Sequence, residues 1–365
     1  MRTLIAILSL SSFFVPWANA QEVSAKQQAP RPPSATPQSG ALVGLTSGQT
    51  LWIAPAGDKI QVPAAPDYVI PRRDGFWRVR LDVNWNDPAL SDVTPGHGRL
   101  WAVRLKKGMP AVAWSAEQPI TNTSEEANKQ EEGTVGAMQR EADEEGRRIE
   151  PLFLSPDYLS FYDAHTEVSS GGSTKGSETY TILKITDPPA TPGRTTEQLL
   201  VEEIHGTISD DTRNNDLRAC VRADDKLSDS DKEWALGQET TLGITRNQQR
   251  WIYSWLIEGG AGLSCPASIP PLKSIVGNNE IFLDWKQIKS TFPAAEDAFS
   301  SPAHDLLLIV TEVRLIVAPV RDGKIGKPLG EVTLTGKPVM VQWAIGRYVD
   351  AWTNELTQYF DVYHM

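Results

Sequence analysis

The feature that most constrains the fold is a series of short apolar and aromatic runs, which turn residues interrupt repeatedly between Leu51 and Trp343. In the run Phe76–Leu81 three apolar residues alternate with two arginines, which is the period of a half-buried strand. We therefore predict a mainly β chain. The candidate strands are Leu51–Ala54, Phe76–Leu81, Leu100–Leu105, Ala111–Trp114, Pro151–Leu154, Tyr158–Tyr162, Tyr180–Ile185, Leu199–Ile208, Leu217–Val221, Thr240–Thr245, Arg250–Glu258, Ile281–Trp285, Leu306–Val310, Val313–Val320, Pro328–Leu334 and Val339–Trp343.

The last four candidate strands follow one another between Asp305 and Trp343, with a turn signal at Arg321-Asp322-Gly323. A unit of this size and content is typical of one propeller blade. Many short strands separated by turns indicate a sandwich, a barrel or a propeller. We predict a propeller-like arrangement of short antiparallel strands, and paired β sandwiches are the alternative.

Two segments have a helical pattern. Ser230–Leu236 predicts one short turn of helix. At the C-terminus, apolar residues recur at spacings of three and four from Ile345 to Phe360, which places them on one helical face. We expect this amphipathic helix to pack on the β body through Tyr348, Trp352 and Leu356, and a face that binds a partner is the alternative.

The N-terminal residues predict export. Residues 1–20 combine Arg2, a short apolar stretch and Ala18-Asn19-Ala20, the pattern of a signal peptide that is cleaved before Gln21. Residues 21–40 are rich in Pro, Gln and Ser and predict a disordered tether. We expect a periplasmic or extracellular location.

The remaining chain divides into a β body and a helix. The body covers residues 41–343, and the helical segment covers residues 344–365. Residues 124–150 interrupt the body with a strongly charged stretch that contains two glycines, so we expect a solvated insertion there. An acidic arm that docks a basic partner is the alternative interpretation.

The charge of the chain excludes some partners. The formal net charge is −11, and such a surface repels phosphate backbones, which argues against nucleic-acid binding. Beyond the signal peptide no apolar run approaches the roughly 18 to 20 residues needed to span a bilayer, so we expect no membrane insertion.

The two cysteines, Cys220 and Cys265, most simply form one disulfide in an oxidising compartment. Two free thiols are the alternative, and a metal site with only two thiolates is a weaker one. The five histidines have no ligand spacing, so we expect neither a metal nor a cofactor.

The sequence lacks G-x-S-x-G, H-E-x-x-H, Walker and G-x-G-x-x-G motifs. Glu203 and His205 are the best catalytic candidates. On a strand they would share a face, and a carboxylate can orient an imidazole for acid–base chemistry. A polar cross-strand pair on a sheet surface is the favoured interpretation of the two residues.

Two further patterns have a structural and a functional interpretation. The acidic residues between Asp210 and Glu233 could bind a hard cation, or they could be solvated loop residues with a helix cap at Ser228 or Asp229. Trp251, Tyr253 and Trp255 would share one face of a strand. They form either part of the core or a platform on which sugar rings stack.

These observations favour an exported, soluble β protein that acts as a binding or scaffolding module for a protein or carbohydrate ligand, without catalysis. The alternative is a secreted hydrolase that acts on polysaccharide through paired carboxylates. Two carboxylates about 5 to 10 Å apart in a cleft would favour the hydrolase.

Overall fold

A computed structural model describes residues 37–82, 99–104, 146–168, 174–185, 209–259 and 262–360. The chain divides into two units, Met1–Ala35 and Thr36–Met365, and the described residues all belong to the second unit. The predicted signal peptide, most of the tether and residues 124–145 lie outside the described residues. Two predicted boundaries shift: one strand begins at Ser39, within the predicted tether, and another begins at Gly146, within the predicted insertion.

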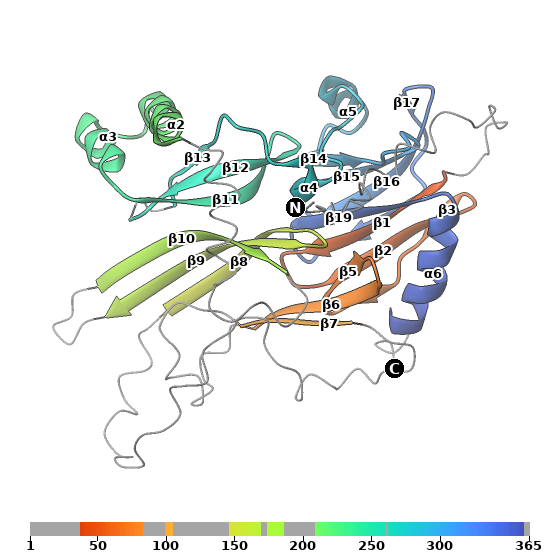
Figure 1. Ribbon diagram of the computed structural model, residues 1–365. Helices are drawn as coiled ribbons and strands as arrows, with labels where there is room; N and C mark the ends of the chain where they lie inside the picture. The colour runs from red at the N-terminus through yellow and green to blue at the C-terminus, as the bar shows by residue number, and fades with distance from the viewer. Residues whose placement is uncertain are drawn as a thin grey trace, which may run out of the picture. The chain divides into compact units, whose positions relative to one another are not determined.

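The first and the last strand of the described chain lie side by side in one sheet (Figure 1). The strands of this sheet are, in order, β19 (Pro338–Ile345), β1 (Ser39–Leu45), β2 (Thr50–Ala56) and β3 (Lys59–Gln61), and β4 (Ala64–Ala65) also pairs with β2. Neighbouring residues of β1 enter two different hydrophobic clusters, Leu42 on one face and Val43 on the other. Because both residues are fully buried, the sheet is covered on both faces.

A second sheet contains β5 (Tyr68–Arg72), β6 (Gly75–Asp82) and β7 (Arg99–Arg104). The predicted turn is present, since Arg72 pairs with Gly75 across Arg73 and Asp74. Trp77 and Val79 on β6 are buried, as the alternating pattern predicts.

The longest strands form a third sheet, β10–β9–β8. Its members are β8 (Gly146–Leu154), β9 (Tyr158–Val168) and β10 (Thr174–Lys184). This sheet contacts β11 (Thr240–Asn247) of the next sheet. A hypothetical Cβ on Gly243 of β11 would lie 2.8 Å from the ring of Tyr180 on β10, so only glycine permits this approach.

β11 pairs with β12 (Arg250–Ile257), which pairs with the short strand β13 (Ser264–Pro266). Two helices precede this sheet in the chain: α2 (Asp210–Ala223) and α3 (Asp229–Leu236). The helix predicted at Ser230–Leu236 is thus present. The strand predicted at Leu217–Val221 is wrong, because these residues belong to α2. Leu217 and Val221 are four residues apart and are the buried residues of that helix.

The fifth sheet is built from residues near the C-terminus and carries two short helices. Its strands are β14 (Asp297–Ser300), β15 (Leu306–Val310), β16 (Arg314–Arg321) and β17 (Lys324–Ile325), with β18 (Gly330–Thr333) also paired to β16, and the helices are α4 (Lys273–Val276) and α5 (Trp285–Thr291). Asp322 and Gly323, both with positive φ, form the predicted two-residue turn. The strand predicted at Ile281–Trp285 is wrong, since Asp284 caps α5, which starts at Trp285.

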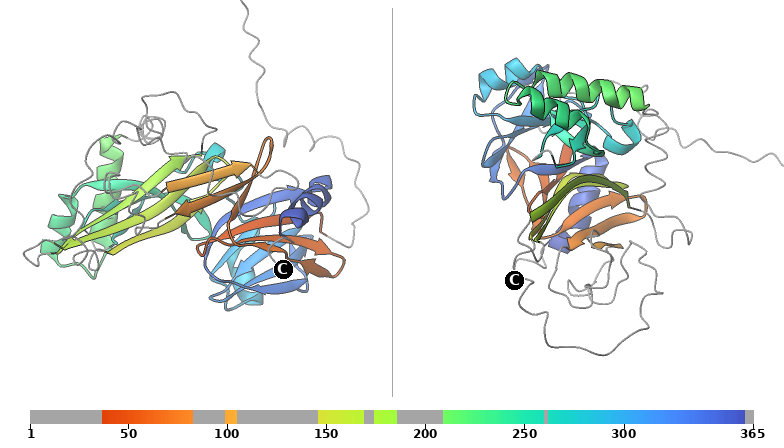
Figure 2. Two further views of the ribbon diagram at one scale, coloured as in Figure 1. Left: turned by 90° about the horizontal axis from the view of Figure 1, so that it is seen from below. Right: turned by 90° about the vertical axis from the view of Figure 1, so that its left-hand side faces the viewer.

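The C-terminal helix α6 (Arg347–Phe360) lies against β2, β4 and β19 (Figures 1 and 2). Its buried residues are Leu356 and Phe360. The ring of Trp352 lies 5.6 Å from that of Trp52 and 5.2 Å from that of Phe76. The predicted contact through Tyr348 is wrong, because that residue is 53% exposed.

The described chain is mainly β and consists of several small antiparallel sheets, which confirms the broader fold prediction. The propeller is not confirmed. Of the four strands predicted to form one blade between Asp305 and Trp343, the last is β19, which pairs with β1 in a different sheet. None of the helices in the described ranges is long and apolar enough to cross a membrane.

Candidate functional site

The pair of helices α2 and α3 is the best-defined candidate surface, and it begins with local sequence signals. Ser209 caps α2 by accepting a hydrogen bond from the Thr212 backbone N–H. Ser228 and Asp231 form a reciprocal capping box at the start of α3. The helix cap that the sequence predicted at Ser228 is therefore confirmed. These caps satisfy backbone donors that would otherwise be left without partners at the helix ends.

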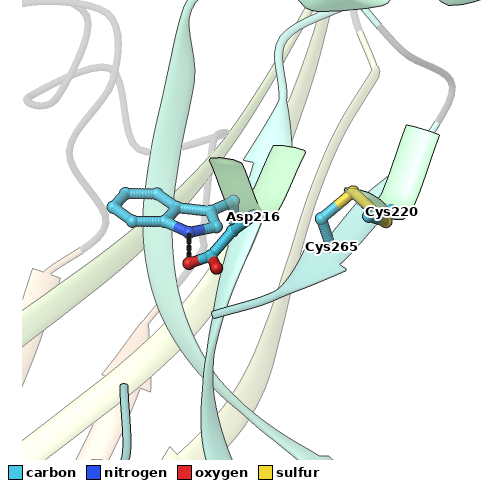
Figure 3. Close-up of a disulfide and its surroundings, with 4 residues drawn as sticks. Asp216, Cys220 and Cys265 are labelled. Carbon is cyan, nitrogen blue, oxygen red and sulfur yellow. Dashed lines mark hydrogen bonds between the residues drawn. A yellow bond between two sulfur atoms is a disulfide. The ribbon is translucent and has the colours of Figure 1, made fainter. Parts of the chain in front are cut away.

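A disulfide attaches α2 to the β11–β12–β13 sheet. Cys220 on α2 and Cys265 on β13 are bonded, with their Cα atoms 5.7 Å apart (Figure 3). The predicted pairing is thus seen in the structure. Leu217 and Val221 flank Cys220 and enter the same hydrophobic cluster as Cys265. The bond and the apolar contacts together hold one side of the helix on the sheet.

Asp216 gives α2 a polar attachment one turn before the disulfide (Figure 3). Its Oδ2 atom accepts hydrogen bonds from the Ser268 backbone N–H at 3.0 Å and from the Trp255 indole N–H at 3.4 Å. Trp255 is only 1% exposed, so its indole N–H has no access to water and needs an acceptor within the protein. In the sequence Asp216 is one of several acidic residues between Asp210 and Glu233, and this role was not predicted.

Trp234 on α3 is the aromatic residue of the α2–α3 pair, and 46% of its surface is exposed. Its ring lies against the turn that follows β12, where a Cβ built on Gly259 would be 3.6 Å away. Glu258, which precedes this glycine, donates its backbone N–H to the carbonyl of Glu239 at 3.0 Å. Trp234 was not among the candidate residues predicted from the sequence. The signal that could have found it is a tryptophan directly after Lys232 and Glu233 in a short polar helix.

The aromatic stripe that the sequence selected lies in the core. Trp251 and Tyr253 are 3% exposed, and Trp255 is 1% exposed. Stacking on a sugar needs an open ring face, and these rings are covered. The structure therefore corrects the platform interpretation in favour of core packing, because the stripe faces the largest hydrophobic cluster of the described chain.

Arg246 lies at one end of this stripe and joins two sheets. Its guanidinium donates to Asp297 on β14 and, at 2.8 Å, to the carbonyl of Ala298. The same group lies 4.0 Å from the ring centroid of Phe299 and 5.0 Å from that of Trp251. Burial lowers the pKa of Arg246, and its hydrogen bond and charge interaction with Asp297 oppose that shift. Arg246 therefore has a structural role, because it connects the sheet that contains β11 to the sheet that contains β14.

The two catalytic candidates, Glu203 and His205, lie outside the described residues. The described acidic residues between Asp210 and Glu233 lie on α2, on α3 and in the connection between them. Asp210 pairs with Arg213, and Asp224 accepts from the Lys226 backbone N–H. Within the described ranges no group of three or more His, Cys, Asp or Glu residues has metal-binding geometry.

No family model matches this chain, and no curated protein or solved structure matches it either. What the site can do therefore depends on its own geometry. That geometry is helix α2, fixed to a sheet by a disulfide, a carboxylate and apolar contacts, next to helix α3, whose Ala235 enters the same hydrophobic cluster and whose Trp234 is exposed.

Proposed function

We propose that this protein is an exported binding or scaffolding module, and that the surface around Trp234 contacts a protein partner. The observation that carries the proposal is the exposure of this tryptophan on α3, the helix that contacts the disulfide-bonded helix α2. Tryptophan is enriched among the residues that contribute most to protein–protein binding. A rigid surface also loses little conformational entropy when a partner binds.

The location is part of the same proposal. A cysteine pair at bonding distance is compatible with a periplasmic or extracellular compartment, where disulfides persist. Cleavage before Gln21 gives a defined mature N-terminus, which the intact mass of the exported protein would reveal. The propeller-like arrangement of the β body remains a prediction, and the binding proposal does not depend on it.

Site-specific photo-crosslinking tests the binding function. A photoreactive amino acid replaces Trp234 in one variant and Tyr348, the comparably exposed aromatic of α6, in the control. Both variants are expressed in the native host. We expect a discrete cross-linked product at position 234 that excess unlabelled protein suppresses, and no such product at position 348. Equal labelling at both positions, or none at either, would contradict the proposal.

A further inference from the structure

We infer that the Trp234 surface docks a lysine- and arginine-rich segment of the partner protein. This inference rests on the proposed binding function and adds the chemistry of the partner. Its first support is the position of the indole, which lies beside the turn at Gly259, where a Cβ built on the glycine would be 3.6 Å away, and which leaves 46% of the residue open to solvent. In the described part of the chain no guanidinium lies over this ring, in contrast to Trp77 and Trp251.

The second support is the charge around the indole. From Ser228 to Glu239 the sequence contains four acidic residues and one basic residue, a net charge of −3. Asp231 precedes Trp234 by three positions and therefore lies on the same side of the helix. Glu239 and Glu258, whose backbones are hydrogen-bonded at 3.0 Å, flank the turn that the indole contacts. The open ring thus lies in an acidic part of the chain.

Carboxylates and an aromatic face together favour cations. A guanidinium or ammonium group over a tryptophan ring is attracted to the negative face of the ring, and nearby carboxylates add charge-assisted hydrogen bonds and long-range attraction. This protein uses the same chemistry internally, since Arg72 lies 4.9 Å from the ring centroid of Trp77. An anionic partner would be repelled. A neutral sugar could stack on the ring but would gain nothing from the charge.

Binding of defined probes tests the inference. We would measure fluorescence anisotropy of a labelled peptide in which arginine and lysine alternate with glycine. An otherwise identical glutamate peptide and a labelled neutral oligosaccharide serve as comparison probes. We expect only the cationic peptide to bind, and its affinity to fall at least tenfold when salt rises from about 50 to about 300 mM, because exposed charges are then screened.

Variants locate the binding surface. Trp234→Ala should weaken binding of the cationic peptide roughly tenfold, which corresponds to about 1.4 kcal/mol. Tyr348→Ala, the matched control, should leave it unchanged. Glu233→Lys reverses an exposed charge without removing the indole and should weaken binding by a similar factor, whereas Glu312→Lys on an exposed turn should not. Because Glu233→Lys retains the indole, it still tests the inference if the Trp234→Ala protein does not fold.

The outcomes separate this inference from the proposed function. The inference of a cationic partner would be overturned if Trp234→Ala bound the cationic peptide as tightly as Tyr348→Ala does. It would also be overturned if Glu233→Lys bound the peptide as tightly as Glu312→Lys does. Binding of the oligosaccharide or the glutamate peptide in place of the cationic peptide would overturn it too. A cross-linked product at position 234 together with either result would leave the binding function standing and replace only the chemistry of the partner.

Discussion

Arg246 and Asp297 form a bidentate ion pair, with Nε 2.8 Å from Oδ2 and Nη2 3.1 Å from Oδ1. The pair connects β11 to β14, and both side chains are largely buried, with 14% and 20% of their surface exposed. Phe299 and Trp251 stack against the guanidinium, so the pair is held in place by aromatic rings as well as by charge. Two sheets that are separate in the chain are thus joined by one side chain.

Removing one partner of this pair should destabilise the protein. Arg246→Gln leaves Asp297 without its counter-charge in a largely buried position, and we expect the free energy of unfolding to fall by roughly 3 kcal/mol. Chemical denaturation of the parent and variant proteins measures this difference in the free energy of unfolding. The exposed pair Arg314–Glu331 provides the control, since Arg314→Gln should cost less than about 1 kcal/mol. Equal losses in the two variants would mean that Arg246 does not join the sheets.

Truncating Trp352 should loosen α6. The ring contacts Trp52 and Phe76 but is only partly buried, so Trp352→Ala should cost about 2 to 4 kcal/mol, slightly less than a fully buried site. Tyr348→Ala, in the exposed first turn of the helix, should change stability by no more than about 0.5 kcal/mol. Thermal melting of both variants compares them. An unchanged melting point for Trp352→Ala would show that the helix does not depend on this contact.

The disulfide should contribute to stability through the unfolded state. It closes a loop with a sequence separation of 45 residues. In the chain-entropy model the double variant Cys220→Ala, Cys265→Ala should lose about 4 kcal/mol, and less if the unfolded chain retains structure. Non-reducing peptide mapping of the parent protein is the control for the bond. Two freely alkylated thiols in native protein would show that the bond does not form.

Alkaline pH should weaken the fold through buried tyrosines. Burial raises the pKa of Tyr162 from its ordinary value of 10.0 to about 12, and burial likewise raises the pKa of Tyr68, Tyr180 and Tyr253. Between about pH 10 and the folded-state pKa, the unfolded chain loses these protons while the folded chain keeps them. The unfolded state then binds fewer protons, so the free energy of unfolding falls as pH rises through this window.

Two measurements check the alkaline effect. Tyrosinate absorbance should rise above pH 10 later in the native protein than in the denatured protein. Tyr68→Phe should reduce the alkaline loss, and it should cost about 1 kcal/mol at neutral pH because the hydrogen bond from the Tyr68 hydroxyl to the Leu45 carbonyl, 2.7 Å long, is removed. Titration of every tyrosine near pH 10 in the folded protein would refute the effect.

The turn between β11 and β12 offers a stabilising change. Gln248 and Gln249 both have positive φ, 45° and 63°, a conformation that costs residues other than glycine roughly 1 kcal/mol or more each. Replacing them with Asn-Gly, the pair that this turn prefers, should raise the free energy of unfolding by about 1 kcal/mol. Gly323→Ala in the corresponding turn should lower it by a similar amount, since Gly323 has a φ of 71°. Denaturation midpoints report both shifts.

Local features could be predicted from the sequence by itself because short-range chemistry determines them. The turns at Arg73-Asp74 and Asp322-Gly323 follow from residues that favour turns. The amphipathic helix follows from the spacing of its apolar residues, and the disulfide follows from the presence of two cysteines in a chain predicted to be exported. The pattern also showed that Trp251 and Trp255 share a face, although it left open whether that face was covered.

Only the tertiary structure decided which segments meet. β19 could pair with its neighbour β18 or with β1, and the two alternatives leave the same local pattern in the sequence. The Trp52 indole N–H donates a hydrogen bond to Thr353, which is 301 residues away in the sequence. The sequence around either residue contains no signal of this contact. At Leu217–Val221 a cap, a buried i, i+4 pair and a disulfide partner on β13 outweighed a short apolar run that resembles a strand. The strand pairing, this hydrogen bond and the helix depend on competition between contacts of residues that are far apart in the sequence. The energies of these contacts cannot be derived from a short segment of sequence.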